Sequence, residues 1–195
     1  MTQSQYLILA HDQNCVDACV LDELKGIECE WELHEGVSQI AKFPKGVTFT
    51  MHPDYPYNTV LTDSLRNTDL VFVASLRLKD FLEARALSDV EYLRVTVIDH
   101  KCRTASRNFY IIHPINPVDC LDIDKCEVKW SKIDSKDISS LRHLVLDESK
   151  LNPQRALFRP KYFCQVILVE RNLAESIDRE GFTGIRWIEL KDYPE

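Results

Sequence analysis

The chain has 195 residues, of which 45% are hydrophobic and 28% charged, with a net charge of −7. This composition supports a hydrophobic core and argues against disorder, and the length predicts one domain over residues 1–195. Apolar runs fall short of the ~18 residues that a membrane-spanning helix needs, so no membrane partner is expected. Seven scattered cysteines and the lack of a signal-peptide pattern predict reduced thiols and a cytoplasmic protein.

The negative charge is concentrated in an acidic N-terminal portion, residues 1–68. Residues 1–60 hold nine acidic residues against three lysines, and the rest of the chain holds 22 against 21 basic residues. Nucleic-acid binding needs a basic surface, so no nucleic-acid partner is expected. An acidic surface suits a protein partner with a basic surface, and the alternative is a solvated face that only aids solubility. The densest acidic residues are Asp12, Asp17, Asp22, Glu23, Glu28, Glu30, Glu32 and Glu35.

The first elements in chain order are predicted from short periodic runs. Residues 6–10 predict a strand, and helical spacing of apolar residues over 16–24 predicts a short helix. Strict alternation over 28–33 predicts a half-buried strand that turns its glutamates to water. Residues 43–51 predict one arm of a hairpin.

A loop rich in proline follows, over residues 52–58. It carries Tyr55 and Tyr57. On a stiffened loop these aromatic side chains either anchor a partner protein or fold back over the core.

The next feature is a pattern that occurs twice, 95 positions apart. Residues 71–95 and 166–190 each predict a strand, a helix and a strand. Gly181 is expected just after the second helix, where glycine is favoured. Neither copy holds a nucleophile, a metal-ligand set or a phosphate loop, so both are interpreted as scaffold, which favours binding over catalysis.

The remaining segments add strands. Residues 91–112 predict a hairpin, and further strands are expected at 127–130, 141–146 and 156–159. The sum is an α+β fold: a mixed or antiparallel sheet, a few short helices and two related strand–helix–strand units.

Residues that could carry chemistry lack the patterns that chemistry requires. Asp119, Asp122 and Asp124 lack the spacing and the glycine of a calcium loop. Cys15 and Cys19, near His11, lack the second ligand pair of a zinc site. Glycine-rich phosphate motifs are absent from the sequence. We therefore predict no catalytic, metal-binding or cofactor-binding residues.

Four short motifs occur in a fixed order: Asn-Phe-Tyr-Ile-Ile at 108–112, Val-Asp-Cys-Leu-Asp at 118–122, Ala-Leu-Phe-Arg at 156–159 and Gly-Phe-Thr-Gly-Ile at 181–185. With the repeated units, they make residues 69–190 resemble a family of bacterial immunity proteins from polymorphic-toxin and contact-dependent killing systems. The resemblance implies a cytosolic protein without catalysis that binds a cognate toxin and blocks it. Arg159, in the third motif, is expected to pair with a carboxylate beneath the sheet.

Three functions stay open at this point. The first is an immunity protein whose acidic segment, with Tyr55 and Tyr57, covers the basic active-site cleft of a toxin, possibly that of a nuclease. The second is an effector chaperone or adaptor that binds without inhibiting. The third is a small enzyme with a cysteine or histidine nucleophile, which requires a thiol of lowered pKa in a cleft. The sequence does not fix the oligomeric state.

Overall fold

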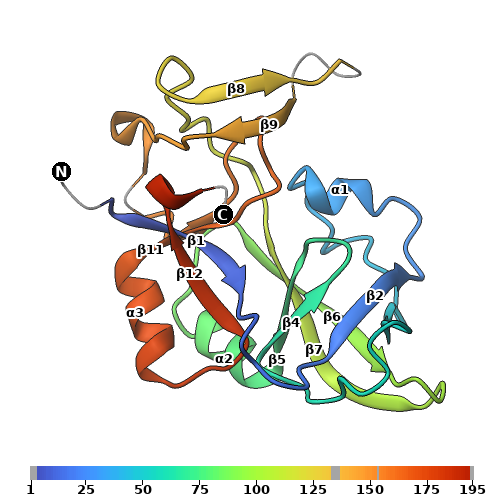
Figure 1. The fold of residues 1–195 in the computed structure, drawn as a ribbon. Coiled ribbons are helices and arrows are strands. Elements are labelled where there is room, and N and C mark those ends of the chain that lie inside the picture. The colour runs from blue at the N-terminus through green and yellow to red at the C-terminus, as the bar shows by residue number, and fades with distance from the viewer. Residues whose placement is uncertain (1–3, 133–136, 153, 194–195) are drawn as a thin grey trace.

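The structure, a computed structural model, describes residues 4–132, 137–152 and 154–193, and strands dominate it (Figure 1). The strands are β1 (Tyr6–His11), β2 (Val20–Lys25), β3 (Thr48–Met51), β4 (Ser64–Asn67), β5 (Phe72–Ser75), β6 (Val90–Ile98), β7 (Thr104–Pro114), β8 (Glu127–Trp130), β9 (Ile138–Arg142), β10 (Leu157–Phe158), β11 (Leu168–Glu170) and β12 (Ile185–Glu189). The helices are α1 (Trp31–His34), α2 (Leu76–Glu83) and α3 (Arg171–Arg179), with 3-10 helices η1 (Glu148–Lys150) and η2 (Leu190–Asp192). Mixed strand pairing and short helices confirm the predicted α+β class.

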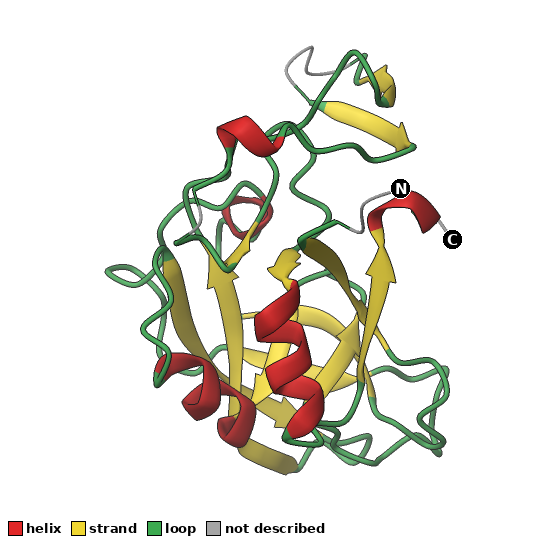
Figure 2. Cartoon of the chain, turned by 90° about the vertical axis from the view of Figure 1, so that its left-hand side faces the viewer, coloured by secondary structure: helices red, strands yellow, loops and turns green. Residues whose placement is uncertain are grey.

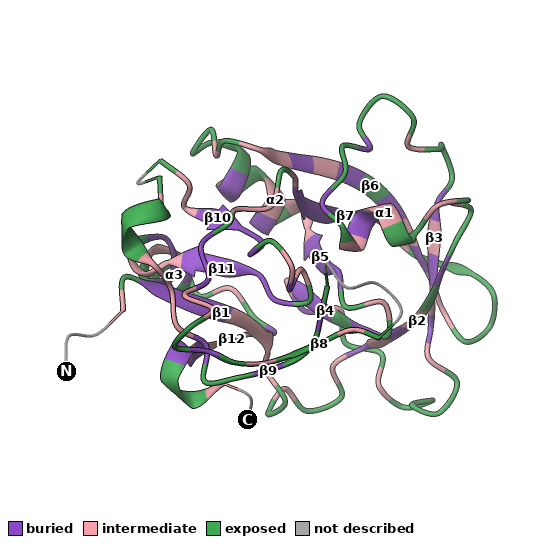
Figure 3. Cartoon of the chain, turned by 90° about the horizontal axis from the view of Figure 1, so that it is seen from above, coloured by how far each residue is buried: buried purple, intermediate pink, exposed green. Residues whose placement is uncertain are grey.

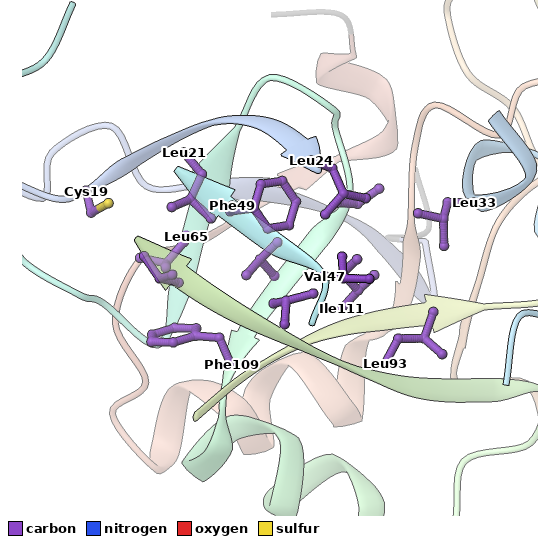
Figure 4. Close-up of a cluster of buried hydrophobic side chains, with 14 of the residues drawn as sticks. Cys19, Leu21, Leu24, Leu33, Val47, Phe49, Leu65, Leu93, Phe109 and Ile111 are labelled. Carbon is purple, nitrogen blue, oxygen red and sulfur yellow. The ribbon is translucent and has the colours of Figure 1, made fainter. Parts of the chain in front are cut away.

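One group of strands closes into a barrel in the order β2-β3-β6-β7-β5-β4. Parallel pairing of Val20 and Leu21 in β2 with Arg66 and Asn67 in β4 completes the closure. Because successive side chains of a strand face opposite sides, alternate residues fill the interior. Figure 4 shows this core, which includes Leu21, Phe49, Leu65, Leu93 and Ile111. The sequence predicted β5, β6, β7 and part of β3, but not β2, β4 or the closure of the barrel, which depends on pairing between segments far apart in the chain.

A second sheet has the order β10-β11-β1-β12, and β8 and β9 form a separate two-stranded sheet. One face of the second sheet packs against the β8-β9 region through a second cluster, to which β1 contributes Tyr6 and Ile8 and β9 contributes Leu141. The predicted strands at 6–10 and 127–130 are therefore confirmed, as β1 and β8.

The two predicted strand–helix–strand units are confirmed as β5-α2-β6 and β11-α3-β12. In each unit the two strands flank a third strand that runs antiparallel to both: β7 in the first unit and β1 in the second. β7 follows β6 directly, whereas β1 comes from the other end of the chain. Figures 1 and 2 show α2 and α3 side by side, and a third cluster joins the units through Leu78, Leu82, Leu173 and Ile177.

The segment before β12 approaches the barrel closely at Gly184. A Cβ there would lie 2.3 Å from the carbonyl oxygen of Ser64, and Gly184 has a φ of +81°. Only glycine fits both conditions without strain. Beside it, Thr183 accepts the Ser64 N–H through its carbonyl and donates its own N–H to Asp63, so this turn ties the second unit to β4. The prediction that the chain is one domain with an acidic portion, residues 1–68, and a second portion, residues 69–190, stays a prediction.

Two predictions in the acidic portion were wrong. Residues 16–24 form a turn and then β2 rather than a helix. The helical spacing of Val16, Val20 and Leu24 does not form one buried face, because Val16 is exposed in the turn, Val20 is half-buried and Leu24 is buried in the barrel. Residues 28–33 form a loop and the start of α1 rather than a strand, and Trp31 is exposed although Leu33 is buried.

Smaller corrections concern strand bounds and Arg159. The arm predicted at 43–51 shortens to β3, and the strand predicted at 141–146 becomes β9, which ends before His143 because that residue has a φ of +54°. Arg159 is buried and donates to the carbonyl oxygen of Cys164, and no carboxylate in the described part of the chain forms an ion pair with it. Burial lowers the pKa of Arg159 to about 10.

Candidate protein-binding surface

Strand β2 turns two of the predicted acidic residues outward. Leu21 and Leu24 occupy the barrel interior, so Asp22 and Glu23 between them face solvent. The Asp22 carboxylate lies 3.9 Å from Nε2 of His52, at the start of the loop that carries the two tyrosines. β2 therefore connects the region around α1 with the 52–58 loop.

A half-buried acidic residue that the sequence analysis did not identify, Asp69, lies next to Asp22 and Glu23. Asp69 accepts the backbone N–H of Leu24 at 2.8 Å. Burial, and further the charges of Glu30 and Glu23, raise the pKa of Asp69 above its usual value. Glu30 and Glu23 therefore both lie close enough to Asp69 for their charges to act on it. We call Asp22, Glu23, Glu28, Glu30 and Asp69 the acidic face.

The acidic residues around α1 differ in whether their carboxylates are free to contact a partner protein. Glu28, Glu30 and Glu35 are exposed. Glu32 instead accepts from Lys42 and from the amide of Gln39, and these bonds lower the pKa of its carboxyl. Glu32 therefore holds the loop after α1 in place.

Exposed apolar side chains gather where two loops meet beside the start of β2. Val16, Tyr55, Tyr57 and Val60 are 82%, 39%, 86% and 50% exposed, and we call them the tyrosine patch. The loops are joined because the N–H of Val60 donates to the carbonyl of Asp17 at 2.9 Å and the amide of Asn58 donates to the carbonyl of Ala18. Both predicted tyrosines are therefore exposed, and the exposed Asp17 lies among them.

A second exposed apolar group lies on and after α1. Trp31, Val37 and Ile40 are 54%, 40% and 62% exposed, and we call them the tryptophan patch. Figure 3 shows that the chain around α1, β2 and β3 is largely exposed or half-buried. The sequence analysis missed this patch because alternation placed Trp31 on the buried side of a strand.

Asp12, the first of the predicted acidic residues, forms hydrogen bonds with its neighbours in the chain. Its carboxylate accepts the N–H of Asn14 at 2.9 Å and the thiol of Cys15 at 3.5 Å. It borders a cavity of about 90 Å³ that His11 also lines. Burial and the nearby charge of Arg66 lower the pKa of His11 to about 4, so this imidazole is neutral at pH 7.

The comparison with known families decides the class of this protein. A model of an immunity protein family matches residues 3–192. The chain belongs to the immunity protein family Imm11. A search of curated proteins found no match to the chain. The family match extends the resemblance seen at 69–190 over the acidic portion as well, and it gives this Imm11 protein the role of an immunity protein, with a cognate toxin as its partner.

Five of the seven cysteines of this Imm11 protein do not have the environment of a nucleophile. Burial raises the pKa of the thiols of Cys15, Cys19, Cys120, Cys126 and Cys164. A thiolate nucleophile needs the opposite shift. Within residues 4–132, 137–152 and 154–193, no cluster of three or more His, Cys, Asp or Glu side chains could hold a metal ion. In the same ranges, no helix is both long and apolar enough to cross a membrane.

Proposed function

We propose that this Imm11 protein binds its cognate toxin in the cytosol through the acidic face and the two apolar patches that flank it, and blocks the toxin by covering its active site. The observation that carries the proposal is the coincidence of exposed carboxylates and exposed aromatic side chains on β2, α1 and the 52–58 loop. The protein itself contributes no catalysis.

The charge of this surface defines the partner. Asp22, Glu23, Glu28 and Glu30 are exposed or half-exposed, and they form no ion pair with a lysine or arginine in the part of the chain that the structure describes. The pKa of Asp69 is raised by burial and then by its neighbours Glu30 and Glu23, which means that the carboxylates repel one another. A basic partner would relieve this repulsion and would be steered towards the surface during association.

The aromatic side chains supply the short-range part of the interaction. Trp and Tyr are enriched among the residues that dominate binding energy, because they bury a large area at a small entropic cost. Trp31 and Tyr57 are each more than half exposed, one in each patch. We therefore expect both to become buried in the complex.

A basic cleft is typical of nucleases, which must attract phosphates, so we propose a nuclease as the toxin. In such a complex the carboxylates of the acidic face would occupy the positions of substrate phosphates. Occlusion makes inhibition stoichiometric and competitive with the nucleic-acid substrate.

The test is capture of secreted effectors on the purified protein, followed by an activity assay on the captured partner. The proposal predicts that one equivalent abolishes the partner's activity and that excess substrate relieves inhibition. Capture without loss of activity would instead favour a chaperone or adaptor. Inhibition that substrate cannot relieve would contradict occlusion of the active site.

A further inference from the structure

A groove of opposite charge lies on the outer face of the barrel. It runs between the loop that precedes β3 and the strands β6 and β7, and its volume is about 540 Å³. Its lining includes the apolar or aromatic side chains Phe43, Val47 and Tyr92 and the basic side chains Lys45, Arg94 and Arg107.

The three basic residues stand out in a chain with a net charge of −7. All three are exposed, and none forms an ion pair with a carboxylate among the residues that the structure describes. Nε of Arg94 donates to the carbonyl oxygen of Arg107 at 3.1 Å, which ties the Arg94 side chain to the backbone of β7 at Arg107. The nearest acidic residue on β6, Glu91, is buried and accepts from Ser38 and from the N–H groups of Gln39 and Ile40. The groove therefore has a positive character.

The backbone of β6 is open along this groove. β3 pairs with β6 from Thr96 to Ile98, and the N–H of Thr96 donates to the carbonyl of Val47 at 3.0 Å. Before Thr96, the described strands pair with β6 only on its β7 side. The N–H and C=O groups of successive strand residues point alternately to the two sides of the strand. The backbone groups of Tyr92 and Arg94 therefore point to the same side as those of Thr96, into the groove.

The alternation of backbone groups along β6 continues through the bulge between Val95 and Val97. Between the pairs Val95–Phe109 and Val97–Ser106, β6 advances by two residues and β7 by three, so the extra residue lies on β7. The open edge from Tyr92 to Thr96 is about 13 Å long at 3.3 Å per residue, enough to pair with about four residues of an extended chain.

We propose that this groove binds an extended acidic segment of a partner protein by strand addition. The backbone of the segment pairs with Tyr92 and Arg94, and its carboxylates meet Lys45, Arg94 and Arg107. Strand addition derives affinity from main-chain hydrogen bonds and specificity from side-chain contacts. This occupant is acidic, whereas the toxin surface proposed for the acidic face is basic, so the groove is a second interaction surface. It borders the first surface, because Ile40 of the tryptophan patch also lines the groove.

The test uses a capped hexapeptide in which glutamate alternates with valine. Titration calorimetry measures its affinity, and NMR hydrogen exchange follows the amides of Tyr92 and Arg94. We expect a Kd below about 1 mM, protection of both amides, and at least about tenfold weaker binding by the double variant Arg94→Glu, Arg107→Glu. The double variant Lys129→Glu, Lys161→Glu, which changes the same charge outside the groove, serves as the control.

Two further peptides separate strand addition from simple charge attraction. A peptide with lysine in place of glutamate should not bind. An acidic peptide N-methylated at alternate residues keeps its charge but cannot pair along a strand, so it should lose at least about tenfold in affinity. The proposal is overturned by equal binding of the N-methylated peptide, by equal weakening in the control variant, or by a Kd of the acidic peptide above about 1 mM.

Discussion

Trp31 and Tyr57 are large aromatic side chains that the fold leaves in water, with 54% and 86% of their surfaces exposed. Such exposure contributes little to folding, so a role in binding explains it better. We predict that Trp31→Ala and Tyr57→Ala each weaken binding to the cognate toxin by about 2 kcal/mol, or roughly 30-fold in Kd. Calorimetry or surface plasmon resonance measures the change.

Trp130 provides the matched control for these substitutions, because it is 41% exposed and lies on β8, outside both patches. Trp130→Ala should leave toxin affinity unchanged. The free energy of unfolding of Trp31→Ala and Tyr57→Ala should stay within about 0.5 kcal/mol of the parent. If Trp31→Ala and Tyr57→Ala bind the toxin as tightly as the control Trp130→Ala and the parent do, the patches do not contact the toxin.

His11 makes stability depend on pH. Its folded pKa of about 4 lies below the ordinary value of 6.5, so the unfolded state takes up a proton first as the pH falls. The folded state therefore loses stability below pH 6.5, by about 2 kcal/mol between pH 7 and 5. His11→Gln should remove this part of the pH dependence in urea unfolding, whereas His100→Gln, at an exposed position, should retain it. An unchanged pH dependence in His11→Gln would contradict a buried neutral imidazole.

The two repeated units differ at the residue that begins each helix. Ser75 accepts the N–H of Leu78 at 3.2 Å, whereas Glu170, 95 positions later, makes no side-chain capping bond to α3. We expect Ser75→Ala to lower the free energy of unfolding by about 1 kcal/mol. Glu170→Ala should lower it by less than about 0.5 kcal/mol. Thermal or urea unfolding compares the two variants, and equal losses would contradict the assignment of Ser75 as the cap.

At the scale of elements, long periodic segments were predicted correctly, whereas short ones were predicted correctly only in part: β1 and β8 were, but β2, β4 and α1 were not. The β6-β7 hairpin and both helices of the repeated units have several turns or pleats, so their periods are visible in the sequence. α1 has four residues, too few to show a helical period. The helical spacing at 16–24 joins Val16 in a turn to Val20 and Leu24 in β2, so it crosses an element boundary. The error at α1 also concealed Trp31, since the predicted strand placed that side chain inside.

At the scale of the whole molecule, the charge distribution was visible in the sequence but its geometry was not. Eight acidic residues between positions 12 and 35 were predicted to face a partner. The fold employs Asp12 and Glu32 in local bonds and adds Asp69 from a distant loop. The closed barrel and the basic groove arise from pairings between distant segments, which periodicity cannot reveal.

The most direct measurement is the affinity of the cognate toxin for a variant in which Asp22, Glu23, Glu28 and Glu30 are changed to lysine. Its control changes the exposed residues Asp124, Glu127, Glu148 and Glu175 to lysine, which alters the net charge equally. If the acidic face binds the toxin, the first variant should bind at least about 100-fold more weakly, mainly through a slower association rate, and the control should bind nearly as the parent does. Equal affinities of the two variants would contradict toxin binding by the acidic face.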